Sequence, residues 1–306
     1  MPPASQTRAL GVLVFGACAI GFGPILVRLT EAGPAAAAFW RFLLAVPLIT
    51  LLLAVSGRGR AGADRRGPDR LLLLAGGFIA TDLAFWHYGL KLTSVANATV
   101  LSNLTPILVT AFAWFAFREK PRAVFLAGML LAIGGAALMA VAGDPSRLRP
   151  GSDPLRGDLF SAVAAFWYAA YFIAVARARR TRTALNVMLW STLAALPFLL
   201  AFALGLGEDL TPASLAGWGA CAGLALMHVA GQGSIAWALG RLPTAVTAVV
   251  VLIQPVVAAA LGWLMFGETL TPLQALGGAG ALAGVALAQL SSTTRTPAKV
   301  VAAPQR

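Results

Sequence analysis

Long runs of apolar residues alternate with short polar segments along the whole of this 306-residue chain. A run of about 20 apolar residues is long enough to cross the hydrocarbon core of a membrane, and backbone groups inside lipid have to be hydrogen-bonded within helices. The pattern therefore predicts an all-α membrane protein. Ten transmembrane helices are predicted, at residues 9–30, 34–56, 70–90, 94–117, 122–142, 157–177, 184–206, 213–239, 243–266 and 272–291.

The pattern also repeats at a fixed offset of 149 residues. Laying residues 86–142 over residues 235–291 aligns six pairs of identical residues, namely Pro106 on Pro255, Trp114 on Trp263, Phe117 on Phe266, Glu119 on Glu268, Gly128 on Gly277 and Gly135 on Gly284. Duplications of this kind in a membrane chain are typical of transporters. Because each half has an odd number of predicted helices, the second half would enter the membrane from the opposite side. We expect two inverted five-helix repeats, at 1–142 and 157–291, with an extracytoplasmic linker at 143–156 and a cytoplasmic tail at 292–306.

Positive charges are distributed unevenly between the two sets of loops. With a cytoplasmic N-terminus, the cytoplasmic segments hold 17 of the 23 Lys and Arg residues and the opposite loops hold 5. The positive-inside rule then places both termini in the cytoplasm. The net charge of +12 is explained by short loops that face anionic lipid. Membrane lipid and a small-molecule substrate are therefore the expected partners, nucleic acid is not, and a monomer is compatible with the sequence.

Motifs for catalysis or for metal binding do not stand out in this sequence. Cys18 and Cys221 each fall within a predicted helix and are expected to serve packing rather than a disulfide or a zinc site. No HExxH, GxSxG or Walker sequence is present, so the groups required for hydrolysis and for ATP coupling are lacking. We expect neither an enzyme nor a bound cofactor or metal.

Two stretches of chain and one tripeptide carry a resemblance to a known family. The stretches run from Asn97 to Gly135 and from Thr247 to Gly284, and the tripeptide is Phe39-Trp40-Arg41. Together they resemble the EamA family of the drug/metabolite transporter (DMT) superfamily, over nearly the whole chain, and within it the YddG-like bacterial amino-acid exporters. The resemblance implies alternating access in a bacterial inner membrane, around a central cavity walled mainly by helices one to four and six to nine.

Asp82 and Trp86 are the first candidate site residues. Asp82 lies about twelve residues into the third predicted helix, where a charge costs roughly 3 kcal/mol on insertion and is expected to face a cavity or a partner. It could bind a coupling proton or a substrate amine, or it could form a structural pair or stay protonated. Trp86 follows one helical turn later on the same face, and we interpret it as a residue of the cavity.

The second and sixth predicted helices supply further candidates. Trp167 and Tyr171 share one helix face, with Tyr168 beside them. Such a face can hold an aromatic or apolar substrate between its rings, or it can face lipid. Arg41 could bind a substrate carboxylate through its planar guanidinium. Alternatively, it could extend to the outer surface or pair with Glu31.

Polar residues and prolines in the fourth, eighth and ninth predicted helices complete the candidate site. The polar residues are Asn103, His228 and Gln254, whose side chains could instead hydrogen-bond to a neighbouring helix. Pro106 and Pro255 occupy matching positions in the two repeats and predict kinks, where a site or gate at the membrane midplane is expected. Glu119 and Glu268 are interpreted as exposed turn or gate residues.

The sequence thus predicts an inner-membrane exporter of small metabolites, and it favours amino acids with aromatic or other neutral side chains. Efflux of lipophilic or quaternary ammonium cations is an alternative, because Asp82 and the aromatic face would suffice for it. A non-transporting helper subunit or lipid-handling membrane protein is an alternative of another class.

Overall fold

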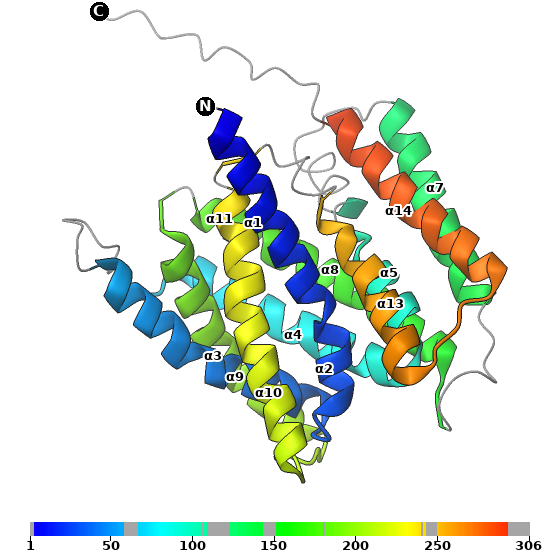
Figure 1. Cartoon of the computed structure of the whole chain (residues 1–306). Helices are drawn as coiled ribbons and strands as arrows, with labels where there is room; N and C mark the ends of the chain where they lie inside the picture. Colours follow the sequence, from blue (N-terminus) through cyan, green and yellow to red (C-terminus); the bar gives the residue numbers. More distant parts are fainter. Residues whose placement is uncertain are drawn as a thin grey trace, which may run out of the picture.

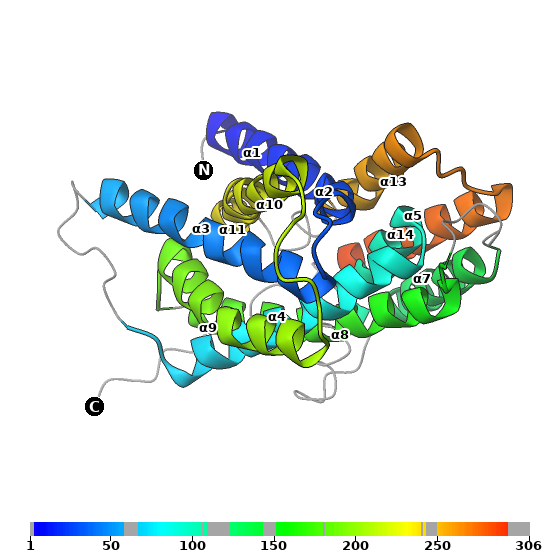
Figure 2. The same cartoon turned by 90° about the horizontal axis from the view of Figure 1, so that it is seen from below.

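The chain forms an assembly of packed helices in a computed structural model that describes residues 3–57, 67–105, 107–108, 123–142, 151–179, 181–239, 241–242 and 250–292 (Figures 1 and 2). The helices are α1 (Pro3–Gly21), α2 (Gly23–Leu29), α3 (Pro34–Gly57), α4 (Arg70–Leu92), α5 (Val95–Ser102), α7 (Ala123–Val141), α8 (Pro154–Ala178), α9 (Ala184–Gly205), α10 (Leu215–Met227), the π-helix η2 (His228–Gln232), α11 (Gly233–Leu239), α13 (Ile253–Phe266) and α14 (Pro272–Ser292). Described helices fall within all ten predicted ranges.

The longest helices are apolar enough to cross a membrane. Within the described residues, five helical segments qualify by length and composition, at Gln6–Leu29, Pro34–Val55, Arg70–Leu92, Pro154–Val175 and Ala184–Gly205. Three described helices are apolar but shorter, at Ala123–Met139, Ile253–Phe266 and Pro272–Ala288. Pro106 and residues 109–117 of the predicted helix at 94–117 lie outside the described residues, and so does Glu119 just beyond it.

Two groups of helices pack together most extensively among the described residues. In the first, α4 packs against α8 and α9, and α3 packs against α9, around a cluster that includes Phe42, Ile79, Leu83 and Leu199. In the second, α7 and α14 run side by side (Figure 1). The helices of this pair approach closely because glycines face each other across their contact.

The contacts between α7 and α14 are reciprocal. A Cβ atom at Gly135 would lie 2.4 Å from the backbone nitrogen of Ala281, and a Cβ atom at Gly284 would lie 2.4 Å from the backbone nitrogen of Ala132. At the offset of 149, Gly284 is the repeat mate of Gly135 and Ala281 is the mate of Ala132. Exchanging the two repeats therefore reproduces the contact, which is the pattern that a local two-fold axis between α7 and α14 gives.

Connecting segments gather at one end of the assembly. The α2–α3 and α9–α10 connections meet where the backbone N–H of Gly33 donates to Asp209 at 3.0 Å. The carboxylate of Glu208 accepts from the first backbone N–H groups of α3, at 3.2 Å from Ala35 and 2.9 Å from Ala36. These bonds satisfy donors that have no partner within the helix, and they place a negative charge at its positive end.

Both repeats interrupt a helix at the same position. α5 ends at Ser102, and Asn103 has φ −77° and ψ 4°. α13 begins at Ile253, and Leu252 before it has φ −65° and ψ −4°. Leu252 is the mate of Asn103 at the offset of 149, and each lies three residues before a proline. The two interruptions are therefore matched in position and in backbone conformation.

Candidate functional site

Arg41 lies in the second turn of α3 and is buried in the protein, with 4% of its surface exposed. Its Nε and Nη1 atoms have no hydrogen-bond partner among the residues that the structure describes. The two alternatives considered for Arg41 are wrong, because the side chain does not reach the surface and Glu31 instead accepts from the backbone and hydroxyl of Ser214, both at 2.9 Å. A buried guanidinium with unused donors is costly unless an acceptor meets it.

Asp82 supplies the opposite charge on the neighbouring helix α4. It is 6% exposed and interacts electrostatically with Arg41. Trp86, one turn further along α4, packs against the core cluster around Phe42 and also against the cluster that includes Val27 and Met227. The indole Nε1 of Trp86 is buried and has no acceptor within the described chain. Arg41 and Trp86 therefore present unmatched polar atoms in the same interior region as the buried Asp82.

Two tyrosines of α8 complete this region. The rings of Tyr168 and Tyr171 lie 5.9 Å apart between centroids and pack against the same core cluster as Trp86. That cluster contains Phe42, which follows Arg41, and Leu83, which follows Asp82. The inward pair is thus Tyr168 with Tyr171, whereas the sequence pattern had emphasised Trp167 with Tyr171. A tyrosine offers an apolar ring together with a hydroxyl that can hydrogen-bond.

His228 is the first residue of the π-helix η2. Its ring lies 4.6 Å from the ring of Phe42, the neighbour of Arg41. Its Nε2 is 3.3 Å from the hydroxyl of Thr192, and its buried Nδ1 has no partner among the described residues. π-helical turns are rare in proteins, and those that do occur are often found at functional sites. We call Arg41, Asp82, Tyr168, Tyr171 and His228 the Arg41 cluster.

Several predicted site residues lie apart from the Arg41 cluster. Trp167 contacts Phe78, with 6.0 Å between ring centroids. Asn103 donates from its side chain to the carbonyl of Thr99 at 2.8 Å, within its own helix. Gln254 is half-buried in the first turn of α13. Pro255 follows it and is buried, whereas Pro106 is outside the described residues. Roles for these five residues in binding or bending stay predictions.

His87, which follows Trp86 on α4, belongs to the interior. It is fully buried, and its Nδ1 donates to the carbonyl of Pro34 at 2.9 Å. Its Nε2 has no partner within the described chain. The spacing from Asp82 could not reveal this, because the partner is a backbone carbonyl at the start of α3. Within the described residues, no three His, Cys, Asp or Glu side chains gather as a metal site would require.

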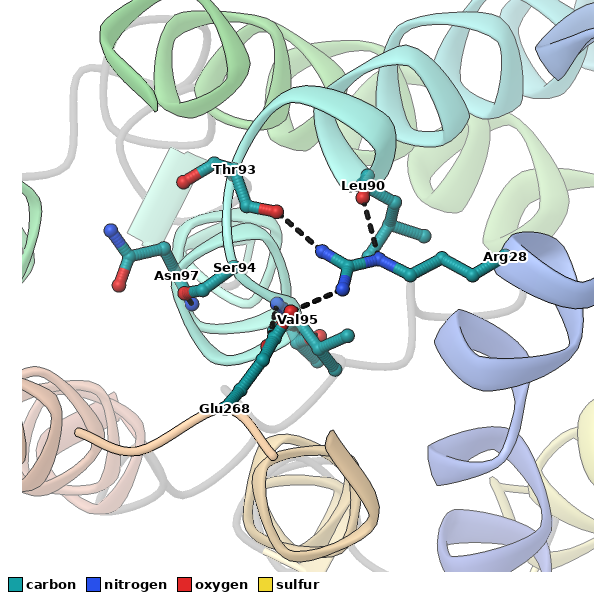
Figure 3. A network of polar contacts seen from close by, with 8 residues as sticks. Arg28, Leu90, Thr93, Ser94, Val95, Asn97 and Glu268 are labelled. Carbon is teal, nitrogen blue, oxygen red and sulfur yellow. Dashed lines mark hydrogen bonds and ion pairs between the residues drawn. The ribbon is translucent and has the colours of Figure 1, made fainter. Parts of the chain in front are cut away.

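A second polar group lies at the junction of α4 and α5 (Figure 3). Arg28, at the end of α2, forms an ion pair with Glu268 and donates to the carbonyls of Leu90, at 2.8 Å, and Thr93. Glu268 also accepts from the backbone N–H of Val95 at 2.9 Å. The prediction that Glu268 is exposed is wrong, because its side chain is 13% exposed. We call these five residues the Arg28 network.

Asp158 of α8 adjoins the Arg28 network through Thr93. Its carboxylate accepts from the hydroxyl of Thr93 at 2.7 Å and from the side-chain amide of Asn97 at 3.3 and 3.2 Å. The amide of Gln274 on α14 donates to Asn97 at 3.3 Å. Sequence reasoning missed Asp158, which stands at the edge of a predicted span. Its position in the first turn of the predicted helix at 157–177 was the only signal in the sequence.

Comparison with known proteins agrees with this architecture. The sequence model of the EamA-like transporter family matches residues 7–141 and again residues 155–290. An uncharacterised transporter of Archaeoglobus fulgidus is 30% identical over 169 residues, or 55% of this chain and 57% of that relative. A second uncharacterised transporter of this organism is 28% identical over 235 residues, or 72% of this chain and 77% of the relative. The chain thus spans less than two thirds of the first relative.

A solved structure extends the comparison to the fold. One crystal structure of a protein aligns with a TM-score of 0.62 at 19% identity, over 94% of this chain and 97% of that chain. Proteins of the matched family are transporters rather than enzymes, and the two Archaeoglobus relatives carry the same description. With two family matches that together cover most of its length, this chain belongs to the EamA-like transporter family.

Proposed function

We propose that this transporter exports amino acids across the bacterial inner membrane, in the manner of the YddG-like exporters, and that the Arg41 cluster is its substrate site. One observation carries the proposal: the buried guanidinium of Arg41 has two unused donor atoms, and the oppositely charged Asp82 is buried on the adjoining helix α4. A carboxylate can occupy both donors of a guanidinium fork, and Asp82 can receive an ammonium group. An amino acid carries both of these charges.

The aromatic residues around the two charges favour bulky neutral side chains. Tyr168, Tyr171 and Trp86 pack against one core cluster next to Arg41 and Asp82. Their rings offer apolar contact area, and an aromatic substrate would stack between them. Contact area discriminates weakly between substrates of similar size. We therefore expect the protein to accept several aromatic and large aliphatic amino acids.

Efflux of lipophilic cations is supported less well. A cation without a carboxylate could bind Asp82 and the aromatic rings, but it would leave the donors of Arg41 unmatched. The positive charge of Arg41 would also repel it. Transport of an amino acid is therefore the better use of the buried pair.

Alternating access follows from the repeats. The reciprocal contacts of α7 and α14 and the matched interruptions at Asn103 and Leu252 support a two-fold relation between the halves. With five helices in each half, we propose that the repeats are inverted in the membrane and that both termini are cytoplasmic, as the distribution of positive charge favours. The interrupted helices would then bend around the Arg41 cluster.

Transport by purified protein in proteoliposomes tests the proposal. Uptake of labelled phenylalanine and of one quaternary ammonium would be compared in empty vesicles, the native protein and five variants. We expect saturable phenylalanine uptake, a KM raised about tenfold or more in Arg41→Lys and Asp82→Asn, and no change in the control Arg8→Lys, whose residue is exposed on α1. Trp86→Ala should raise KM more than Trp167→Ala, which lies apart from the cluster.

Other outcomes would contradict the proposal. Transport of the ammonium alone would move the assignment to cation efflux. Transport of neither compound would favour a helper subunit or a lipid-handling protein. Unchanged phenylalanine kinetics in both Arg41→Lys and Asp82→Asn would leave the transporter assignment intact but remove the Arg41 cluster as its substrate site.

A further inference from the structure

Asp158 is a buried carboxylate that is held only by neutral donors. Its residue is 5% exposed. The hydroxyl of Thr93 and the amide of Asn97 supply its three hydrogen bonds, at 2.7 to 3.3 Å. Burial disfavours the charged form of a carboxylate, whereas hydrogen bonds from donors favour it. A carboxylate balanced in this way changes its protonation state when its surroundings change.

The charged and titratable groups on the surrounding elements are engaged elsewhere. On α4, the ammonium of Lys91 donates to the carbonyl of Ala32 at 2.8 Å, and the hydroxyl of Tyr88 donates to Glu208. On α8, the guanidinium of Arg156 lies over the ring of Phe160, and the carboxylate of Asp153 caps the helix.

Arg28, which donates to the carbonyl of Thr93, and Glu268 neutralise each other as an ion pair. On α5, the neutral amide of Asn97 donates to Asp158, and on α14 the neutral amide of Gln274 donates to Asn97. Within the described residues, Asp158 thus has no ion-pair partner.

Thr93 joins Asp158 to the Arg28 network. Its hydroxyl donates to Asp158, while its carbonyl accepts from Arg28. Arg28 in turn pairs with Glu268 at the end of α13. Thr93, at the α4–α5 junction, therefore contacts the buried acid. It also contacts Arg28 of the ion pair with Glu268, as Figure 3 shows.

We propose that Asp158 binds and releases a proton in each transport cycle, and that Thr93 passes its protonation state to the Arg28–Glu268 pair. A proton taken from one side of the membrane and held on Oδ1, the oxygen that accepts from Thr93, makes this oxygen a hydroxyl donor, so it no longer accepts from Thr93 as a carboxylate oxygen does. The Thr93 hydroxyl then has to turn or move, and its carbonyl moves with the α4–α5 junction. Loss of the proton to the other side restores the present arrangement.

This inference rests on the proposed transport function, and its test separates the two. Proteoliposomes would be assayed for accumulation of phenylalanine driven by an imposed pH gradient, and for exchange of labelled against unlabelled phenylalanine at equal pH. Exchange requires the substrate site to reach both sides but requires no net movement of protons. Asp153→Asn is the matched control, since Asp153 lies in the same segment and asparagine also caps helices well.

The native protein and Asp153→Asn should show both activities. Asp158→Asn should lose gradient-driven accumulation by about tenfold or more while exchange stays within about threefold of the native rate. Gradient-driven accumulation by Asp158→Asn at the native level would overturn the proposal, as would a native protein that exchanges phenylalanine but ignores the pH gradient. A native protein without any exchange would instead contradict the proposed function.

A second variant decides the question if Asp158→Asn does not fold. Thr93→Val preserves the shape of the side chain but removes one donor to the charged carboxylate. The pH of half-maximal transport should then move upward by about one unit, because the carboxylate takes up its proton more readily. A purely structural role predicts a lower rate at every pH with the same midpoint, and that result would overturn the proposal.

Discussion

Arg28 and Glu268 form an ion pair across 240 residues of sequence, with side chains that are only 3% and 13% exposed. The pair does not stand alone, because Arg28 donates to the carbonyls of Leu90 and Thr93 and Glu268 accepts from the N–H of Val95. These bonds satisfy backbone groups at the α4–α5 junction, where neither helix can. The pair therefore fixes the end of α2 and the start of the α13–α14 connection against that junction.

Removing one partner of this pair should be costly. Glu268→Gln keeps an acceptor for Val95 but leaves Arg28 without its counter-charge, so we expect the free energy of unfolding to fall by about 3 kcal/mol. The measurement is denaturant titration of the purified protein in detergent micelles.

The matched control for Glu268→Gln is the ion pair of Arg182 with Asp69. Its N···O distance is 3.1 Å, and the Asp69 side chain is 48% exposed. The Arg182 side chain is 8% exposed, but water reaches and screens the carboxylate of Asp69, so Asp69→Asn should lower the free energy of unfolding by only about 0–1 kcal/mol. Equal losses in the two variants would mean that burial of the Arg28–Glu268 pair contributes nothing.

Neighbouring glycines of α7 should respond to alanine with opposite signs. A Cβ atom at Gly135 would lie 2.4 Å from the backbone of α14, whereas a Cβ atom at Gly134 would have no atom within 4 Å. Gly135→Ala has to separate the two helices and should lower the free energy of unfolding by about 2 kcal/mol. Gly134→Ala should raise it by roughly 0.5–1 kcal/mol, because alanine favours a helix over glycine.

The same measurement tests the two-fold relation. Gly284 repeats the close contact of Gly135 at 2.4 Å from the backbone of Ala132. Gly284→Ala should therefore destabilise the protein to the same extent as Gly135→Ala. A large effect at only one of the two positions would show that α7 and α14 do not share the contact equally.

Hydrophobic runs were sufficient to locate the helices, because spanning a membrane demands a long apolar segment whatever its neighbours are. They could not say which face of a uniformly apolar helix points inward. The pattern therefore emphasised Trp167 with Tyr171, whereas in the structure Tyr168 lies with Tyr171 at the Arg41 cluster. Asp82 and Arg41 were recognisable because a charge inside a span needs a reason.

Other features depend on contacts that a sequence pattern does not contain. The pairing of Arg28 with Glu268 exists only once α2 and the end of α13 meet, so Glu268 was wrongly expected to be exposed. The π-helix at His228 depends on how this turn packs against its neighbours, and no residue type in the sequence predicts it. The bond from His87 to the carbonyl of Pro34 likewise joins two segments that are distant in the chain.

Pro255 should influence how fast the transporter turns over rather than how tightly it binds. It is the third residue of α13, and its missing N–H cannot bond to the carbonyl of Val251 across the interruption at Leu252. In Pro255→Ala that bond can form, so the helix can extend through Leu252 and resist bending. We expect the maximal rate of phenylalanine exchange to fall by about tenfold, with KM changed by less than about threefold.

Pro197→Ala is the control for Pro255→Ala, because Pro197 lies inside the continuous helix α9. Filling its missing hydrogen bond removes no interruption and should leave the maximal rate within about twofold of the native value. If both variants slowed exchange equally, a general stiffening of helices would explain the result. If Pro255→Ala changed only KM, the interruption at Leu252 would shape the substrate site rather than the conformational step. A selective loss of rate in Pro255→Ala would place the bending step of transport at Leu252.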